Sequence, residues 1–124
     1  LRTHLAAAAA IETTVVNQVM AFIEKEHTLG ARVSAAAAAL GYSERSLRRQ
    51  LEQSGTSYRN LVDQVRERRA REMLAGSGLP VQVIAFELGF ETPSNFARSF
   101  KRWTGTTPTA YREGRKMRED RDPN

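Results

Sequence analysis

Two short stretches of the sequence place positive charge beside hydrogen-bonding groups. They contain Arg45, Ser46, Arg48 and Arg49 in the first stretch, and Ser94, Asn95, Arg98, Lys101 and Arg102 in the second. Arginine can donate two hydrogen bonds to guanine, asparagine can form an equivalent pair with adenine, and serine can bond a base or a phosphate. These residue types in clusters therefore favour recognition of nucleic acid.

The spacing of the apolar residues predicts which side of each helix is exposed. In a helix that advances about 100° per residue, burial of Leu47 and Leu51 directs Arg45 and Arg49 outward. In the second stretch, burial of the aromatic residues directs Arg98 outward in the same way. Arg98 then has the same position in its helix as Arg49 has in the first. The two arginines are therefore predicted to be equivalent.

A helix that only exposes its charges to water is a competing interpretation. Arg48 and Glu52 are four residues apart, a spacing that suits an ion pair on one helix. A helical module that binds another protein is a further alternative. Steep weakening of binding with salt distinguishes DNA recognition from both.

The two stretches belong to an internal repeat. It aligns Gly41-Tyr42-Ser43 with Gly89-Phe90-Glu91, Leu47 and Leu51 with Phe96 and Phe100, and Gly55-Thr56-Ser57 with Gly105-Thr106-Thr107. Each copy has a short helix with small residues, a glycine turn followed by an aromatic residue, and a longer amphipathic helix. This is the outline of a helix-turn-helix. A single copy also fits an ordinary helical hairpin, whereas two copies with basic outer faces favour DNA binding.

Apolar periodicity predicts an all-α chain of about seven helices, with two helix-turn-helix subdomains joined by a long connector helix. The predicted segments are 1–12, a linker or frayed helix; 13–56, the first subdomain; 57–75, the connector; 76–113, the second subdomain; and 114–124, a flexible tail. Within them, Thr13 or Thr14 is expected to cap a helix that runs to about His27 and precedes a stop at Gly30, and the last helix to end near Arg112.

Three further residues are expected to cap helix starts, and two of them precede a proline at the first helical position. They are Ser43, Thr92 and Thr107, while Ser57 is expected to start the connector helix. The connector from Ser57 to about Ala75 would span roughly 28 Å at about 1.5 Å per residue. One turn of B-DNA is about 34 Å, so a connector of this length would bring two recognition helices to successive major grooves. A rigid connector would also require the duplex to bend, at a cost of about 1–6 kcal/mol.

Composition narrows the function classes. The 124 residues include 19 Lys and Arg against 14 Asp and Glu, a net charge of +5 that favours anionic partners. The absence of cysteine excludes disulfides, thiolate zinc sites and cysteine nucleophiles, and is consistent with a reducing cytoplasm. His4 and His27 form no metal or nucleophile pattern, and no glycine-rich phosphate loop occurs. We therefore expect no enzyme activity, no cofactor, no metal and no membrane segment.

A longer set of residues forms a specific signature. It comprises Ile84-Ala85, Gly89-Phe90, Ser94, Phe96, Phe100-Lys101-Arg102-Trp103-Thr104-Gly105 and Thr107-Pro108-Thr109-Ala110-Tyr111-Arg112. This signature resembles the C-terminal DNA-binding domain of AraC/XylS-type transcription regulators, and the resemblance extends over roughly residues 30–113. It implies a bacterial regulator, in many cases an activator, that binds double-stranded promoter DNA and contacts RNA polymerase.

The resemblance also implies roles for individual residues. Arg45, Arg48 and Arg49 would read one groove and Ser94, Asn95 and Arg98 the other, while Arg66 in the connector would be structural. Three positions depart from the family pattern: Val83 replaces a polar residue, Pro93 replaces a residue that reaches DNA in some members, and Ala97 offers a base edge little. Many members carry a separate effector or dimerisation domain, and because this chain begins at Leu1 we expect that such a domain lies outside it.

Overall fold

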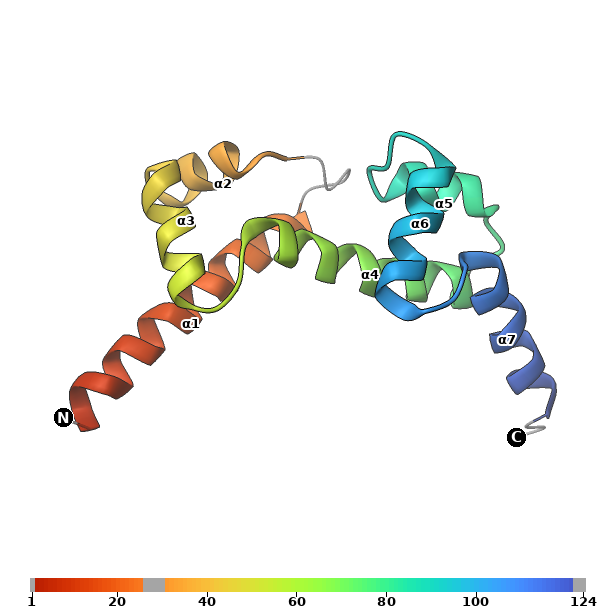
Figure 1. Ribbon diagram of the computed structural model, residues 1–124, viewed down its shortest axis with the longest axis horizontal. Helices are drawn as coiled ribbons and strands as arrows, with labels where there is room; N and C mark the ends of the chain where they lie inside the picture. Colours follow the sequence, from red (N-terminus) through yellow and green to blue (C-terminus); the bar gives the residue numbers. More distant parts are fainter. Residues whose placement is uncertain (1, 26–30, 122–124) are drawn as a thin grey trace. The chain divides into compact units, whose positions relative to one another are not determined.

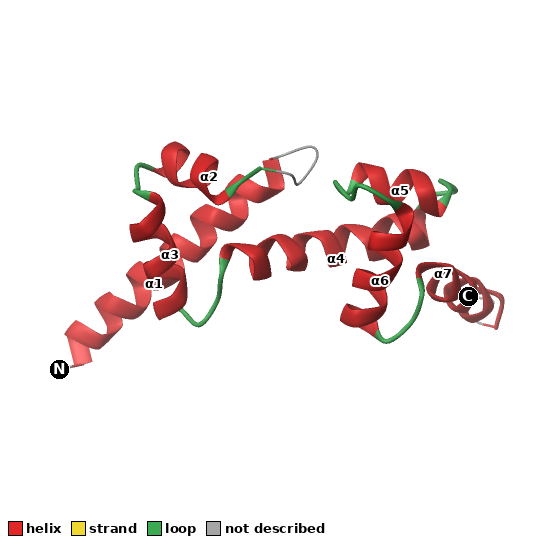
Figure 2. Cartoon of the chain, turned by 45° about the horizontal axis from the view of Figure 1, so that its top comes forward, coloured by secondary structure: helices red, strands yellow, loops and turns green. Residues whose placement is uncertain are grey.

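Seven helices make up the secondary structure of the computed structural model, which describes residues 2–25 and 31–121 (Figure 1). They are α1 (Arg2–Lys25), α2 (Val33–Leu40), α3 (Glu44–Gln53), α4 (Tyr58–Gly76), α5 (Val81–Glu87), α6 (Pro93–Thr104) and α7 (Pro108–Arg121). Within these ranges the chain forms only helices and loops, as Figure 2 shows. The predicted all-α class is confirmed, and none of these helices is both long and apolar enough to cross a membrane.

The chain divides into two compact units, one ending at Val65 and the other beginning at Arg66, so the boundary lies within α4. In the first unit α1 packs against both α2 and α3. Its buried residues recur at every fourth position of α1, where one helix face meets its neighbours: Val15, Val19 and Ile23. Ala36 and Ala37 in α2 are also buried, and their small side chains let α2 and α3 cross closely.

The second unit has an aromatic core. Phe96 and Phe100 of α6 are fully buried, with ring centroids 5.8 Å apart. Phe90, directly after the turn, lies 5.4 Å from Phe96, and Tyr111 of α7 lies 5.4 Å from Phe100. Because these rings come from the turn, α6 and α7, they fix α6 against its own unit.

The three predicted caps form as expected, and Ser57, the expected start of the connector, caps α4 in the same way. Each side-chain oxygen accepts a hydrogen bond from the backbone N–H three residues later, at 3.1 Å in every case: Ser43 from Ser46, Ser57 from Asn60, Thr92 from Asn95 and Thr107 from Ala110. An N-cap of this kind satisfies an N–H group that has no partner within the helix. The starts of α3, α4, α6 and α7 are thus determined by local sequence.

Two predicted helix bounds at the ends of the chain are wrong. Helix α1 begins at Arg2, so neither Thr13 nor Thr14 starts it, because the alanine-rich segment before them has the highest helix propensity. Helix α7 continues to Arg121 instead of ending near Arg112, so 114–121 is not a loose tail. Its Arg, Glu, Lys and Met residues favour helix even where few apolar side chains occur. The predicted end near His27 and the stop at Gly30 fall outside the described residues.

The internal repeat extends to the backbone of the two turns. Gly41 and Gly89 have φ angles of 79° and 84°, a left-handed conformation that side-chain-bearing residues rarely adopt. The next residue in each turn donates a backbone hydrogen bond into the preceding helix: Tyr42 to the Ala37 carbonyl at 2.9 Å and Phe90 to the Ala85 carbonyl at 3.1 Å. The two helix-turn-helix turns therefore close in the same way.

We expect Gly89→Val to lower the free energy of unfolding by about 1–3 kcal/mol, because a β-branched residue is strained at this positive φ. Thermal unfolding followed by circular dichroism measures the loss. Gly78→Val is the control, since Gly78 is exposed, has no positive φ, and a Cβ there would meet nothing within 4 Å. Equal unfolding temperatures for the two variants would contradict the role of Gly89 in the turn.

Candidate nucleic-acid interface

Helix α3 presents its cations to solvent, as the helical wheel predicts. Leu47 and Leu51 are fully buried, whereas Arg45, Arg48 and Arg49 are exposed. Ser46 is half-buried, and its backbone N–H is bound by the Ser43 cap. The predicted cluster therefore forms one surface on α3. The capped glycine turn sets the start of this helix, and the two leucines fix its rotation about its axis.

Arg48 is paired with Glu44 and not with the Glu52 that its spacing also allows. Its Nε and Nη2 atoms lie 3.3 Å and 3.0 Å from Oε1 of Glu44. The two side chains are 60% and 47% exposed, so water screens the pair and its contribution to stability is below about 1 kcal/mol. Arg45 and Arg49 have no such partner among the described residues. On α3, Arg45 and Arg49 therefore keep their full positive charge, whereas the charge of Arg48 is compensated by Glu44.

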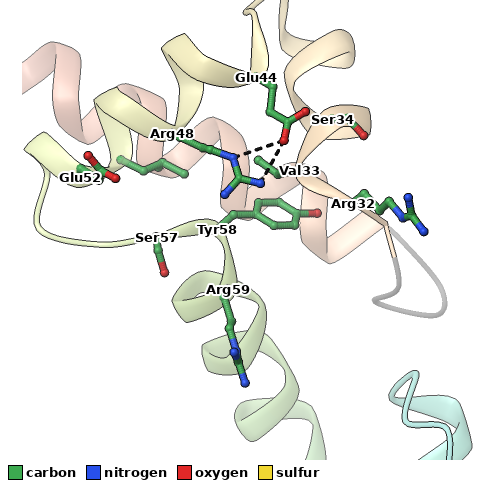
Figure 3. A pocket seen from close by; sticks show the side chains of 10 residues that line it. Arg32, Val33, Ser34, Glu44, Arg48, Glu52, Ser57, Tyr58 and Arg59 are labelled. Carbon is green, nitrogen blue, oxygen red and sulfur yellow. Dashed lines mark hydrogen bonds and ion pairs between the residues drawn. The ribbon is translucent and has the colours of Figure 1, made fainter.

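A hollow of about 530 Å³ lies beside Glu44 and Arg48 of α3, next to the first turns of α2 and α4. In Figure 3 the guanidinium of Arg48 lies near the ring of Tyr58, while Arg32 and Arg59 extend away from it. The Tyr58 hydroxyl donates a hydrogen bond to the Ala31 carbonyl at 2.9 Å, which ties the start of α4 to the segment before α2. Sequence reasoning missed Arg32 and Arg59, because only the fold brings them to the edge of α3.

Helix α6 carries the second predicted cluster. The exposed side chains on it are Ser94, Arg98, Lys101 and Arg102, while Asn95 is half-buried. Helix α6 contains no acidic residue, and its two fully buried phenylalanines place this cationic surface outward. Nη2 of Arg98 donates a hydrogen bond of 2.5 Å to Oδ1 of Asn95. The two residues expected to read bases are thus joined to each other.

Arg66 of α4 holds the turn that precedes α6. Its Nε atom donates to the Leu88 carbonyl at 3.1 Å and its Nη2 atom to the Gly89 carbonyl at 3.5 Å. The guanidinium carbon also lies 4.6 Å from the centroid of the Phe90 ring, a cation–π geometry. The last carbonyl groups of a helix have no N–H partner within it and carry partial negative charge. Arg66 supplies hydrogen bonds and a positive charge to the carbonyl groups at the end of α5. Arg66 is structural, as the resemblance implies.

Arg112 performs a similar task at the end of α4, which sequence reasoning did not predict. Its Nε atom donates to the Leu74 carbonyl at 3.1 Å and its Nη2 atom to the Ser77 carbonyl at 3.3 Å. Cations are favourable beside the carbonyl end of a helix. Because 38 residues separate Arg112 from Leu74, no local pattern signals the contact.

The three positions that depart from the family pattern have distinct surroundings. Val83 is exposed on α5 together with Phe86, which is 56% exposed, so this face of α5 is apolar. Pro93 is the first residue of α6 and Ala97 is half-buried within it. Hydrogen bonding from α6 therefore depends on Ser94, Asn95, Arg98 and the two cations that follow.

Comparisons with known proteins agree with this arrangement. A model of the "Helix-turn-helix domain" family matches residues 36–114. The ornithine utilization regulator of Pseudomonas aeruginosa is 49% identical over 78 residues, which cover 63% of this chain and 23% of that protein. The chain therefore spans less than a quarter of the length of this curated relative.

Solved structures share the fold. The transcriptional regulator CdpR from Pseudomonas aeruginosa is 34% identical with a TM-score of 0.76, over 80% of this chain and 31% of that one. The DNA-binding domain of AdpA, solved in complex with a target DNA, is 25% identical with a TM-score of 0.69, over 90% and 97% of the two chains. With two helix-turn-helix units, the repeated glycine turns and the matched family model, this chain belongs to the AraC/XylS family of helix-turn-helix DNA-binding domains.

Proposed function

We propose that this domain binds double-stranded promoter DNA sequence-specifically and inserts α3 and α6 into successive major grooves. The observation that carries the proposal is the equivalence of the two helices. Each follows a left-handed glycine turn, buries its apolar face and exposes an arginine at the same position, Arg49 or Arg98. The connector α4 has 19 residues, about 28 Å at 1.5 Å per residue, which is compatible with one turn of B-DNA.

The two helices are proposed to divide the work. On α3, Arg45 and Arg49 contact base edges, with Ser46 and Arg48 beside them, and the carboxylate of Glu52 limits unspecific attraction to phosphates. Helix α6 has three cations and no acidic side chain, so Lys101 and Arg102 mainly anchor phosphates while the residues near its start contact bases. The first unit then contributes more to sequence preference and the second more to affinity.

The biological role follows the family. We propose that the chain is the DNA-reading part of a bacterial transcription regulator, an activator that contacts RNA polymerase in the cytoplasm and performs no catalysis itself. An effector or dimerisation domain would belong to the same protein, because the curated relative matched here is more than four times longer than the aligned segment. That relative is a regulator of ornithine utilization by name, which supports this role.

The test is selection of bound sites from random duplexes, followed by titration of a selected duplex at several salt concentrations. We expect two short boxes about one helical turn apart and affinity that falls steeply with salt. Arg49→Ala and Arg98→Ala should each weaken binding by about tenfold or more, and each should lose preference in a different box. A larger loss of base preference in Arg49→Ala than in Arg98→Ala would support the proposed division of work.

Arg115→Ala is the matched control, because it removes the same charge from an exposed position on α7. It should leave the base preferences unchanged. Absence of duplex binding even at low salt would overturn the proposal and favour a module that binds another protein.

A further inference from the structure

The hydrogen bond between Arg98 and Asn95 determines how the asparagine amide is oriented. The two residues are three positions apart on α6, and Nη2 of Arg98 lies 2.5 Å from Oδ1 of Asn95. A guanidinium group has five N–H donors and no acceptor. The amide atom that faces Arg98 must therefore be the oxygen, and the amide NH₂ group and the second lone pair of the oxygen are left for another partner.

This orientation changes what the second recognition helix can read. Asparagine recognises adenine by accepting a bond from the N6 amino group while donating one to N7, which requires both amide atoms. Arg98 binds one of the two lone pairs of Oδ1, so an adenine amino group that used the other would lie beside the cationic guanidinium, whose remaining groups are all donors. Guanine presents two acceptors, O6 and N7, in the major groove. The donors of the guanidinium therefore match the two acceptors of guanine, whereas the amino donor of adenine would face them unfavourably.

Helix α3 provides a useful contrast. On α3, Arg48 forms an ion pair with the carboxylate of Glu44, which neutralises the charge of the arginine. On α6 a neutral amide holds Arg98, so the guanidinium is positioned while its full charge remains available. Arg98 also retains four of its five donors for a base, and no acidic side chain of α6 competes for them.

We propose that Asn95 and Arg98 act as one unit that makes α6 specific for guanine. Arg98 makes the bidentate contact to O6 and N7, and Asn95 is a positioning residue that does not read adenine. This inference rests on the proposed function and deepens it by naming the base.

The experiment uses a duplex selected by the native chain from a random pool. The box read by α6 is the one whose preference is lost in Arg98→Ala. In that box, one guanine is replaced by adenine or by 7-deazaguanine, which lacks the N7 acceptor. For the native chain we expect adenine to weaken binding by about 5- to 150-fold, and 7-deazaguanine to weaken it by about 5- to 10-fold. Neither change should affect Arg98→Ala by more than about twofold.

Asn95 variants separate positioning from direct readout. Asn95→Ala should keep guanine as the preferred base while reducing the guanine-to-adenine preference several-fold. Asn95→Asp should bind more weakly to all duplexes, because its carboxylate neutralises Arg98 in the way that Glu44 neutralises Arg48. Thr109→Ala, at an exposed position of α7 in the same unit, is the control and should leave the guanine preference intact.

An adenine in the α6 box whose preference disappears in Asn95→Ala would overturn the inference, and so would an α6 box without guanine. Both results would leave the proposed function standing, because they require sequence-specific binding. Loss of all duplex binding by the native chain would instead contradict the proposed function.

Discussion

Replacing Phe96 by alanine is expected to lower the free energy of unfolding of the second unit by about 3–5 kcal/mol. The Phe96 side chain is fully buried and lies 5.4 Å from the Phe90 ring and 5.8 Å from the Phe100 ring. Alanine would leave a cavity between the turn and α6 that their backbones cannot close. Urea denaturation followed by circular dichroism, with amide hydrogen exchange to separate the units, measures the loss.

Phe86→Ala is the matched control for this prediction. It removes the same side chain from the same unit, but from an α5 position that is 56% exposed. We expect a change within about 0.5 kcal/mol. A loss of less than about 1 kcal/mol for Phe96→Ala would mean that the aromatic cluster does not hold α6 in place.

Replacing Arg66 by alanine is expected to cost about 2–4 kcal/mol in the same unit. The variant loses charge-assisted hydrogen bonds to the Leu88 and Gly89 carbonyls and the contact with the Phe90 ring. Hydrogen bonds to charged groups contribute about 1.5–3 kcal/mol, and a cation–π contact adds about 0.5–1 kcal/mol. Faster hydrogen exchange in the turn at Gly89 should accompany the loss, because the turn loses the group that binds it.

Two further variants show whether geometry or charge matters at this position. Arg66→Lys keeps the charge but cannot reproduce the planar fork, so it should recover only part of the stability. Arg59→Ala removes an exposed arginine from the same helix, in the first unit, and should be nearly neutral. Full stability of Arg66→Ala would contradict its role in holding the turn.

Features determined by neighbouring residues could be predicted from the sequence. Ser43 and Thr92 cap their helices because the oxygen that accepts the bond and the N–H that donates it are three positions apart. Gly41 and Gly89 mark turns because few other residues tolerate a positive φ. The outward direction of Arg49 follows from the burial of leucines on the same helix. Its contact with a base stays a prediction.

Features determined by competing partners or by distant parts of the chain could not be predicted. Arg48 has a carboxylate four residues away on either side, and spacing alone does not choose between Glu44 and Glu52. The contact of Arg112 with the Leu74 carbonyl bridges 38 residues. The bond from Arg98 to Asn95 does not follow from the residue types either, because each side chain alone is suited to contact a base.

Trp103 gives the second unit an optical signal of its own. It is the one tryptophan in the chain and its ring lies 6.2 Å from that of Phe90, the residue that also contacts Arg66. Its emission therefore depends on the surroundings of the turn before α6, whereas circular dichroism records all the helices. If the two units unfold independently, fluorescence will follow one transition and dichroism two. The native, unlabelled chain thus allows the melting of one DNA-reading unit to be distinguished from that of the other.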